Sequence, residues 1–201
     1  MPSRRLYGER LSETRDNLLM AHQFTTSYLA DSLSILRMYK RLGDRTIDQV
    51  KDQELTLSPD AESNSVATIV KHLAGNMRSR WTDFLTTDGE KPDRHRDMEF
   101  EAPPVTRAEL LELWENGWRL LFSALEPLSD ADLARTVYIR SESHSVMQAI
   151  QRQVGHYAYH VGQIVYLAKH YRSADWKTLS VPRNRSAEFT EKVRRGEASQ
   201  R

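Results

Sequence analysis

The sequence predicts an all-α protein, a four-helix bundle with long connections. Three observations support this fold class. Apolar residues recur at three- and four-residue spacing in four separate stretches. Two of these stretches open with a capping box, and no stretch shows the sustained apolar–polar alternation of a sheet strand. Helices that each carry one apolar face bury that face by packing together, which favours a bundle.

Composition places the chain among ordinary globular proteins. It has 201 residues, of which 39% are hydrophobic and 28% are charged, and its net charge is +1. This balance provides no general attraction for nucleic acid or for an anionic membrane. No apolar run is long enough to cross a bilayer, and the N-terminus lacks the pattern of a signal peptide. We therefore expect a cytoplasmic protein with neither nucleic acid nor membrane as a partner.

The chain divides into three predicted parts. Residues 1–20 form a polar N-terminal extension, residues 21–175 form the bundle, and residues 176–201 form an irregular C-terminal tail. The last twenty residues hold six basic and three acidic side chains. Such a mixture is more typical of a solvated chain end than of a nucleic-acid site.

The first two helices follow from their apolar spacing. One pattern runs from Leu18 to Tyr39, and we expect Gly43 to end or bend this helix. Asn64 or Ser65 then caps a second helix, whose apolar side continues as far as Leu85.

A long polar loop at 86–104 separates the second helix from the third. A loop of this length in a compact domain is usually functional or well packed. The third helix opens with the capping box Thr106–Glu109, and Pro127 stops it. Thr136–Ile139 is β-branched and is expected to be extended.

The fourth helix carries the most informative pattern. It opens with the capping box Ser145–Gln148 and contains His156 and His160 at i,i+4 spacing, which places both imidazoles on one face. The remaining positions are largely apolar, so we expect a helix that is buried nearly all round. Polar side chains on a buried face, such as those of His156 and His160, cost free energy unless hydrogen-bond partners or an ion satisfy them.

His72, midway along the second helix, supplies a third imidazole if the second and fourth helices pack side by side. Three imidazoles with an open position are typical of catalytic metal sites, although an H-x-x-x-H pair alone is more often two ordinary histidines. The chain has no cysteine, so a metal needs histidine, carboxylate or amide ligands. One turn further along, Asn76 and Gln163 are candidates for hydrogen bonds to the ligands or to a substrate.

Two segments together resemble the DinB/YfiT-like superfamily of bacterial metal-binding four-helix bundles. They are Asn64-Ser-Val-Ala-Thr-Ile-Val-Lys-His-Leu-Ala-Gly-Asn and Gly155-His-Tyr-Ala-Tyr-His-Val-Gly-Gln-Ile. The resemblance covers roughly residues 20 to 190. Two further segments resemble a narrower branch of this superfamily, which is classified as a domain of unknown function. They are Arg80-Trp-Thr-Asp-Phe-Leu-Thr-Thr-Asp-Gly-Glu-Lys-Pro and Leu179-Ser-Val-Pro-Arg.

The resemblance implies a divalent metal, zinc or nickel in most relatives, held by His72, His156 and His160. Characterised relatives include S-transferases and isomerases that use a small thiol such as bacillithiol or mycothiol. This chain departs at Val161, where many relatives carry arginine, and at Asn184, where the branch tends to carry glycine.

Two functional hypotheses remain open. The first is a metal-dependent S-transferase that joins a low-molecular-weight thiol to a small-molecule substrate. The second is a metal-binding stress or interaction protein without turnover. Large aromatic and aliphatic side chains on the first and third helices exceed the needs of one bundle seam, so we also expect a homodimer.

Overall fold

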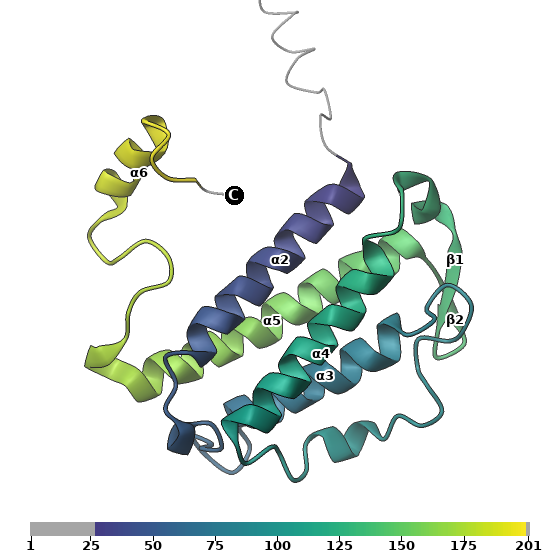
Figure 1. Ribbon diagram of the computed structural model, residues 1–201, viewed down its shortest axis with the longest axis horizontal. Coiled ribbons are helices and arrows are strands. Elements are labelled where there is room, and N and C mark those ends of the chain that lie inside the picture. The colour runs from purple at the N-terminus through teal and green to yellow at the C-terminus, as the bar shows by residue number, and fades with distance from the viewer. Residues whose placement is uncertain (1–26, 200–201) are drawn as a thin grey trace, which may run out of the picture.

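The structure, a computed structural model, describes residues 27–199 (Figure 1). It contains the four long helices α2 (Tyr28–Ile47), α3 (Val66–Trp81), α4 (Arg107–Leu125) and α5 (Val146–Arg172). Helix α2 packs along α5, and α3 packs along α4. Contacts of α3 with α5 and of α2 with α4 close the bundle. The predicted all-α bundle is confirmed.

Shorter elements occupy the connections. They are the 3-10 helices η1 (Asp52–Glu54), η2 (Arg96–Glu99), η3 (Asp130–Ala134) and η4 (Ser173–Asp175), the strands β1 (Thr136–Ile139) and β2 (Glu142–Ser145), and the helix α6 (Ser186–Arg194). Strands β1 and β2 pair antiparallel, with Thr136 opposite Ser145. The extended segment predicted at 136–139 is therefore confirmed, whereas its partner strand was not predicted.

Helix starts agree with the capping patterns. The Ser65 side chain accepts a hydrogen bond from the backbone of Thr68, so Ser65 rather than Asn64 is the N-cap of α3. Thr106 and Ser145 each form a complete capping box at the starts of α4 and α5. Each box satisfies backbone N–H groups that the first turn of a helix leaves without partners.

The predicted helix end at Gly43 was wrong, whereas a bend there stays a prediction. Helix α2 continues through this residue to Ile47, and Gly43 is buried against the indole of Trp114. A Cβ atom at Gly43 would lie 2.4 Å from the Cζ2 atom of Trp114. The glycine admits a close approach of α4 rather than ending the helix. The part of the predicted first helix that begins at Leu18 lies outside the described residues.

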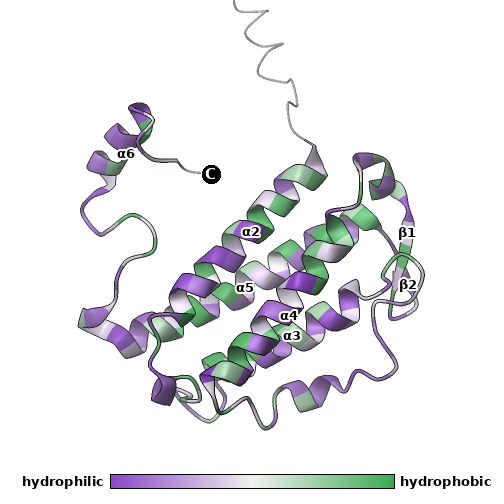
Figure 2. Cartoon of the chain, viewed as in Figure 1, coloured by the Kyte–Doolittle hydropathy of each residue, from purple (hydrophilic) through white to green (hydrophobic). Residues whose placement is uncertain are grey.

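The tail beyond Trp176 is not irregular throughout, because it contains α6. This helix buries no residue and lies apart from the bundle in Figure 1. Figure 2 shows that α6 is mostly hydrophilic, whereas the four long helices carry both kinds of residue. Asn184, just before α6, adopts a left-handed backbone with φ of 65°, a conformation that asparagine tolerates. The limits at residues 20 and 175 stay predictions.

Helix α5 is less buried than we predicted. Tyr159 and Tyr166 are 62% and 70% exposed, and Gly155 and Gly162 lie on the same open side. The reason is that α5 packs on α2 and α3, which leaves a third side to solvent. Tyrosine combines an apolar ring with a polar hydroxyl and therefore suits both environments. Among the described residues, no helix has the length and apolar character needed to cross a membrane.

Candidate metal centre

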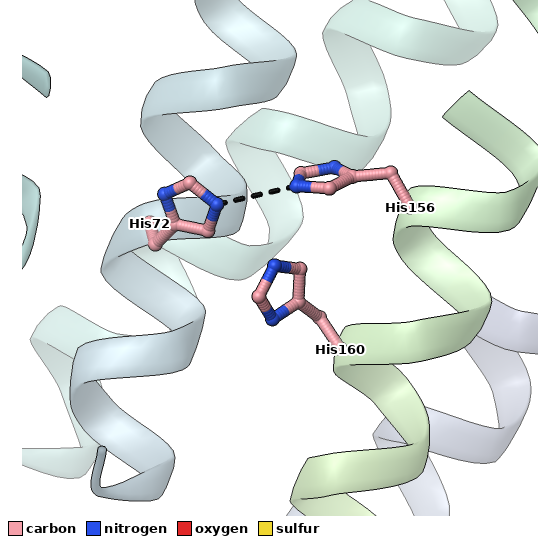
Figure 3. A group of neighbouring side chains, drawn as sticks. All are labelled: His72, His156 and His160. Carbon is pink, nitrogen blue, oxygen red and sulfur yellow. Dashed lines mark hydrogen bonds between the residues drawn. The ribbon is translucent and has the colours of Figure 1, made fainter. Parts of the chain in front are cut away.

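The three predicted histidines meet between α3 and α5. Figure 3 shows the ring of His72 on α3 pointing toward the rings of His156 and His160 on α5. The Nε2 atoms of His72 and His156 are 3.3 Å apart. One ring nitrogen from each histidine lies within 4.8 Å of those of the other two. The packing of α3 on α5 thus brings together residues 84 positions apart in the sequence.

Neighbouring side chains fix two of the three rings. The Nδ1 atom of His72 lies 2.8 Å from Oε2 of Glu99, and Nδ1 of His160 lies 2.8 Å from Oε1 of Gln163. A carboxylate only accepts, so Nδ1 of His72 donates, and in a neutral imidazole the Nε2 atom then carries a lone pair. The amide nitrogen of Gln163 donates to the hydroxyl of Tyr159, which leaves its Oε1 to accept from His160. Both Nε2 atoms are therefore free to bind a cation.

The arrangement fits a metal bound by imidazole. Nitrogen ligands about 2.0–2.1 Å from a tetrahedral zinc ion lie about 3.3–3.4 Å from one another. The 3.3 Å separation of the Nε2 atoms of His72 and His156 matches this spacing, and the third histidine has a ring nitrogen within 4.8 Å of theirs. Among residues 27–199, these three histidines form the one such cluster of His, Asp or Glu side chains. Imidazole suits zinc, nickel, iron and copper alike.

The surroundings keep two of these histidines neutral. Burial, together with the smaller effects of the nearby His160 and His72, lowers the pKa of His156 to about 3. Burial and then His72 lower the pKa of His160 to about 4, against a smaller upward effect of Gln163. Both imidazoles therefore carry no proton that competes with a metal at neutral pH.

Glu99 is a site residue that the sequence did not reveal. It lies in the 86–104 loop, in η2, and is buried. Burial alone raises the pKa of its carboxyl, but hydrogen bonds from His72 and Arg94 outweigh burial and shift the pKa downward. Arg94 holds both carboxylate oxygens, with Nε 2.8 Å from Oε1 and Nη2 2.9 Å from Oε2. The only signal for this role was the length of the loop.

A pocket of about 730 Å³ opens beside the histidines. Asn76 and Gln163, the two residues predicted to bind ligands or substrate, both line it. Gln163 contacts His160 directly, as described above. Asn76 instead accepts a hydrogen bond from the Tyr157 hydroxyl at 3.2 Å, and Tyr157 in turn accepts one from Trp81 at 2.8 Å. Asn76 is thus tied into the contact of α3 with α5, and its predicted role toward ligands stays a prediction.

The fold is thus a bundle of four long helices that holds three imidazoles between α3 and α5. A crystal structure described as a DinB-like protein from Bacillus cereus ATCC 10987 matches with a TM-score of 0.53 and 14% identity, over 75% of this chain and 95% of that one. At this identity the likeness shows a shared fold. The family model described as "Protein of unknown function (DUF1572)" matches residues 23–185, so the chain belongs to that family. No curated protein sequence matches it.

Proposed function

We propose that this protein binds a divalent metal, zinc or nickel, through His72, His156 and His160. The observation that carries the proposal is the 3.3 Å approach of the Nε2 atoms of His72 and His156. If both atoms carry lone pairs they repel each other, and a cation between them removes that repulsion. If His156 instead carries an Nε2–H, the two atoms share a hydrogen bond; the buried Nδ1 of His156 has no partner among the described residues in either tautomer.

We further propose that the site is catalytic. Among the described residues, no carboxylate or fourth histidine joins the cluster, and the adjoining pocket offers room for a small molecule. Sites with three protein ligands and an open position are typical of enzymes, whereas structural sites close with four. A bound divalent metal lowers the pKa of a water or thiol at its open position.

The reaction class that we propose is S-transfer from a low-molecular-weight thiol. The thiol must come from outside because the chain has no cysteine. Its sulfur attacks an electrophilic carbon of the second substrate, so a C–S bond forms while the leaving group departs with its bonding electron pair. The thiol proton passes to solvent. The chain contributes the three imidazoles, the hydrogen bonds that orient them, and a pocket that holds the two reactants close together.

Metal analysis followed by a thiol panel tests this proposal. Protein purified without chelator is expected to carry one zinc or nickel ion per chain by elemental mass spectrometry. The loaded protein is then assayed with monobromobimane as electrophile and with cysteine, glutathione, bacillithiol or mycothiol as thiol. Acceleration that requires the metal supports the transferase. A bound metal without acceleration for any thiol supports the non-catalytic alternative, and absence of metal binding contradicts both.

The predicted homodimer stays a proposal. The large aromatic side chains of α4 that suggested it, Trp114 and Trp118, are buried within the bundle. Exposed apolar side chains occur instead on α2, at Ile35 and Met38. Light scattering across the micromolar range tests the dimer, and a monomer mass throughout contradicts it.

A further inference from the structure

The pocket beside the three histidines is strongly basic. Its wall contains five arginines and the three histidines, and none of the residues that line it is acidic. The five arginines are Arg80, Arg94, Arg96, Arg140 and Arg152. A pocket whose wall carries one sign of charge concentrates ligands of the opposite sign.

Two of the arginines are neutralised by carboxylates behind the wall. Arg94 pairs with Glu99 and lies 3.1 Å from Glu90. Arg80 lies 2.8 Å from the same Glu90 oxygen and also donates to the Gly89 carbonyl. Both guanidinium groups are buried, so they hold the loop against α3 rather than offering a free charge.

The exposed arginines lack such compensation. Arg140 lies 3.4 Å from Glu90, a carboxylate already shared with Arg80 and Arg94. Arg152 on α5 has no ion pair within the described part of the chain. The nearest acid to Arg96 is Asp97 at 3.8 Å, which is itself fully exposed. Apart from the fully exposed Asp97, two carboxylates, Glu90 and Glu99, therefore pair with guanidinium groups among the five around this pocket.

The backbone holds Arg140 at the pocket despite a conformational cost. Arg140 and Ser141 form the turn between β1 and β2 with φ of 56° and 64°, a left-handed region that side chains other than glycine seldom adopt. The carboxylate of Asp88 accepts hydrogen bonds from both backbone N–H groups, at 2.8 and 2.7 Å. Gly89 also donates to the Tyr138 carbonyl at 2.7 Å. Residues with a rare backbone conformation are often found at ligand sites, where several contacts hold them in place.

Gln153 provides an independent sign of a polar ligand. It lines the pocket and is 2% exposed, yet its Oε1 atom has no hydrogen-bond partner among the described residues. A buried amide oxygen without a partner costs about 1–3 kcal/mol, and because it only accepts, a donor group of a ligand, not an anionic group, would satisfy it.

We propose that this pocket selects an anionic small molecule, one that carries a carboxylate or phosphate group, and that Arg140 and Arg152 recognise the anion. Guanidinium groups bind both anions through paired hydrogen bonds. The inference rests on the proposed function, because it names the substrate class of the same site.

Calorimetry with malonate, inorganic phosphate and the uncharged analogue malonamide tests the proposal on metal-loaded and metal-free protein. We expect malonate or phosphate to bind both forms and malonamide to bind neither. In the double variant Arg140→Gln, Arg152→Gln, the anion affinity is expected to fall at least about tenfold. The control Arg119→Gln, which removes an exposed arginine of α4 outside the pocket, is expected to leave affinity unchanged. Circular dichroism of each variant, with the single variant Arg152→Gln beside the double one, checks that the fold is kept.

Equal binding of malonamide, or equal anion affinity in the double variant and the control, overturns the anion proposal. Metal content is measured separately by elemental mass spectrometry. A metal-loaded protein that does not bind anions contradicts this inference and leaves the metal proposal standing. A protein that binds anions but no metal contradicts the metal proposal and leaves the anion inference standing.

The transferase assay locates the anion on one of the two reactants. Mercaptosuccinate is compared with mercaptoethanol against monobromobimane, and iodoacetate is compared with iodoacetamide against mercaptoethanol. A lower KM for the charged reactant, lost in the double variant, assigns the anion to the thiol or to the electrophile. Equal KM values in both comparisons contradict an anionic substrate.

Discussion

The Nδ1 atom of His72 lies 2.8 Å from the Oε2 atom of Glu99, a residue 27 positions further along the chain. This hydrogen bond ties the 86–104 loop to α3 and presents the Nε2 lone pair of His72 to the other two histidines. Arg94 donates a hydrogen bond to each oxygen of the same carboxylate. Carboxylates that orient a metal-binding histidine in this way also raise its basicity.

Removal of the Glu99 charge is expected to weaken metal binding. Glu99→Gln keeps the side-chain shape but loses the charge shared by His72 and Arg94, so we expect metal affinity to fall about 10–100-fold. Competition against a chromophoric chelator measures the change. Glu112→Gln, at an exposed position on α4, serves as control and is expected to keep the parent affinity. Equal affinities in the two variants would show that Glu99 has no part in orienting His72.

Much of the fold and the histidine cluster could be predicted because the signals are local. Capping residues and apolar spacing define α3, α4 and α5, and i,i+4 spacing places His156 and His160 together. The role of Glu99 depends instead on the path of a long irregular loop. Nothing local distinguishes its carboxylate from the other acidic side chains of that loop.

The role of Gly43 likewise could not be predicted from the local sequence, because it depends on packing. A glycine inside an apolar pattern is compatible with a helix end or with a close approach of another element. The outcome was decided by Trp114, whose indole occupies the space next to Gly43 and donates a hydrogen bond to Asp44 at 2.6 Å. That tryptophan belongs to a different helix, 70 residues away from Asp44.

Substitution of His156 is expected to separate metal binding from stability. His156→Ala removes a ligand, so metal affinity falls by more than the 10–100-fold expected for the partner residues. The same change removes a buried Nδ1 atom that lacks a partner among the described residues, so the stability of the metal-free protein is expected to change by no more than about 1 kcal/mol. Chelator competition and thermal unfolding measure the two effects. His170→Ala, at an exposed position on α5, is the control, and retention of metal by His156→Ala would exclude His156 as a ligand.

Acid is expected to destabilise the metal-free protein. The pKa values of His156 and His160, about 3 and about 4, lie below the ordinary 6.5. As pH falls below 6.5, the unfolded chain binds protons at these positions and the folded chain does not, so the free energy of unfolding decreases. Each histidine contributes at most about 1.4 kcal/mol per pH unit, and less here because both side chains are partly open to solvent.

Urea unfolding of metal-free protein at pH 7, 6 and 5 measures this dependence. Carboxylates contribute to it as well, and comparison with His156→Ala isolates the histidine share, because the variant is expected to show a shallower decline. Parallel declines in the two proteins would mean that His156 titrates normally in the folded chain.

Gly75 is expected to influence the metal site without contacting it. This glycine lies on α3 one turn after His72, and a Cβ atom there would be 2.3 Å from Oε1 of Glu99. Gly75→Ala therefore forces the Glu99 carboxylate to move and breaks its hydrogen bonds with His72 and Arg94. Alanine favours a helix over glycine by about 1 kcal/mol, which offsets part of the lost ion pair, so the fold is expected to persist. Metal affinity is nevertheless expected to fall about 10–100-fold, as in Glu99→Gln.

Gly162→Ala is the matched control, because Gly162 also lies inside a helix but a Cβ atom there would meet nothing within 4 Å. It is expected to gain stability from helix propensity and to keep the parent metal affinity. The double variant Gly75→Ala, Glu99→Gln adds a decisive comparison. If Gly75 acts only through the carboxylate, the double variant binds metal no more weakly than Glu99→Gln alone. Additive losses would instead mean that alanine at this position shifts His72 or α3 itself.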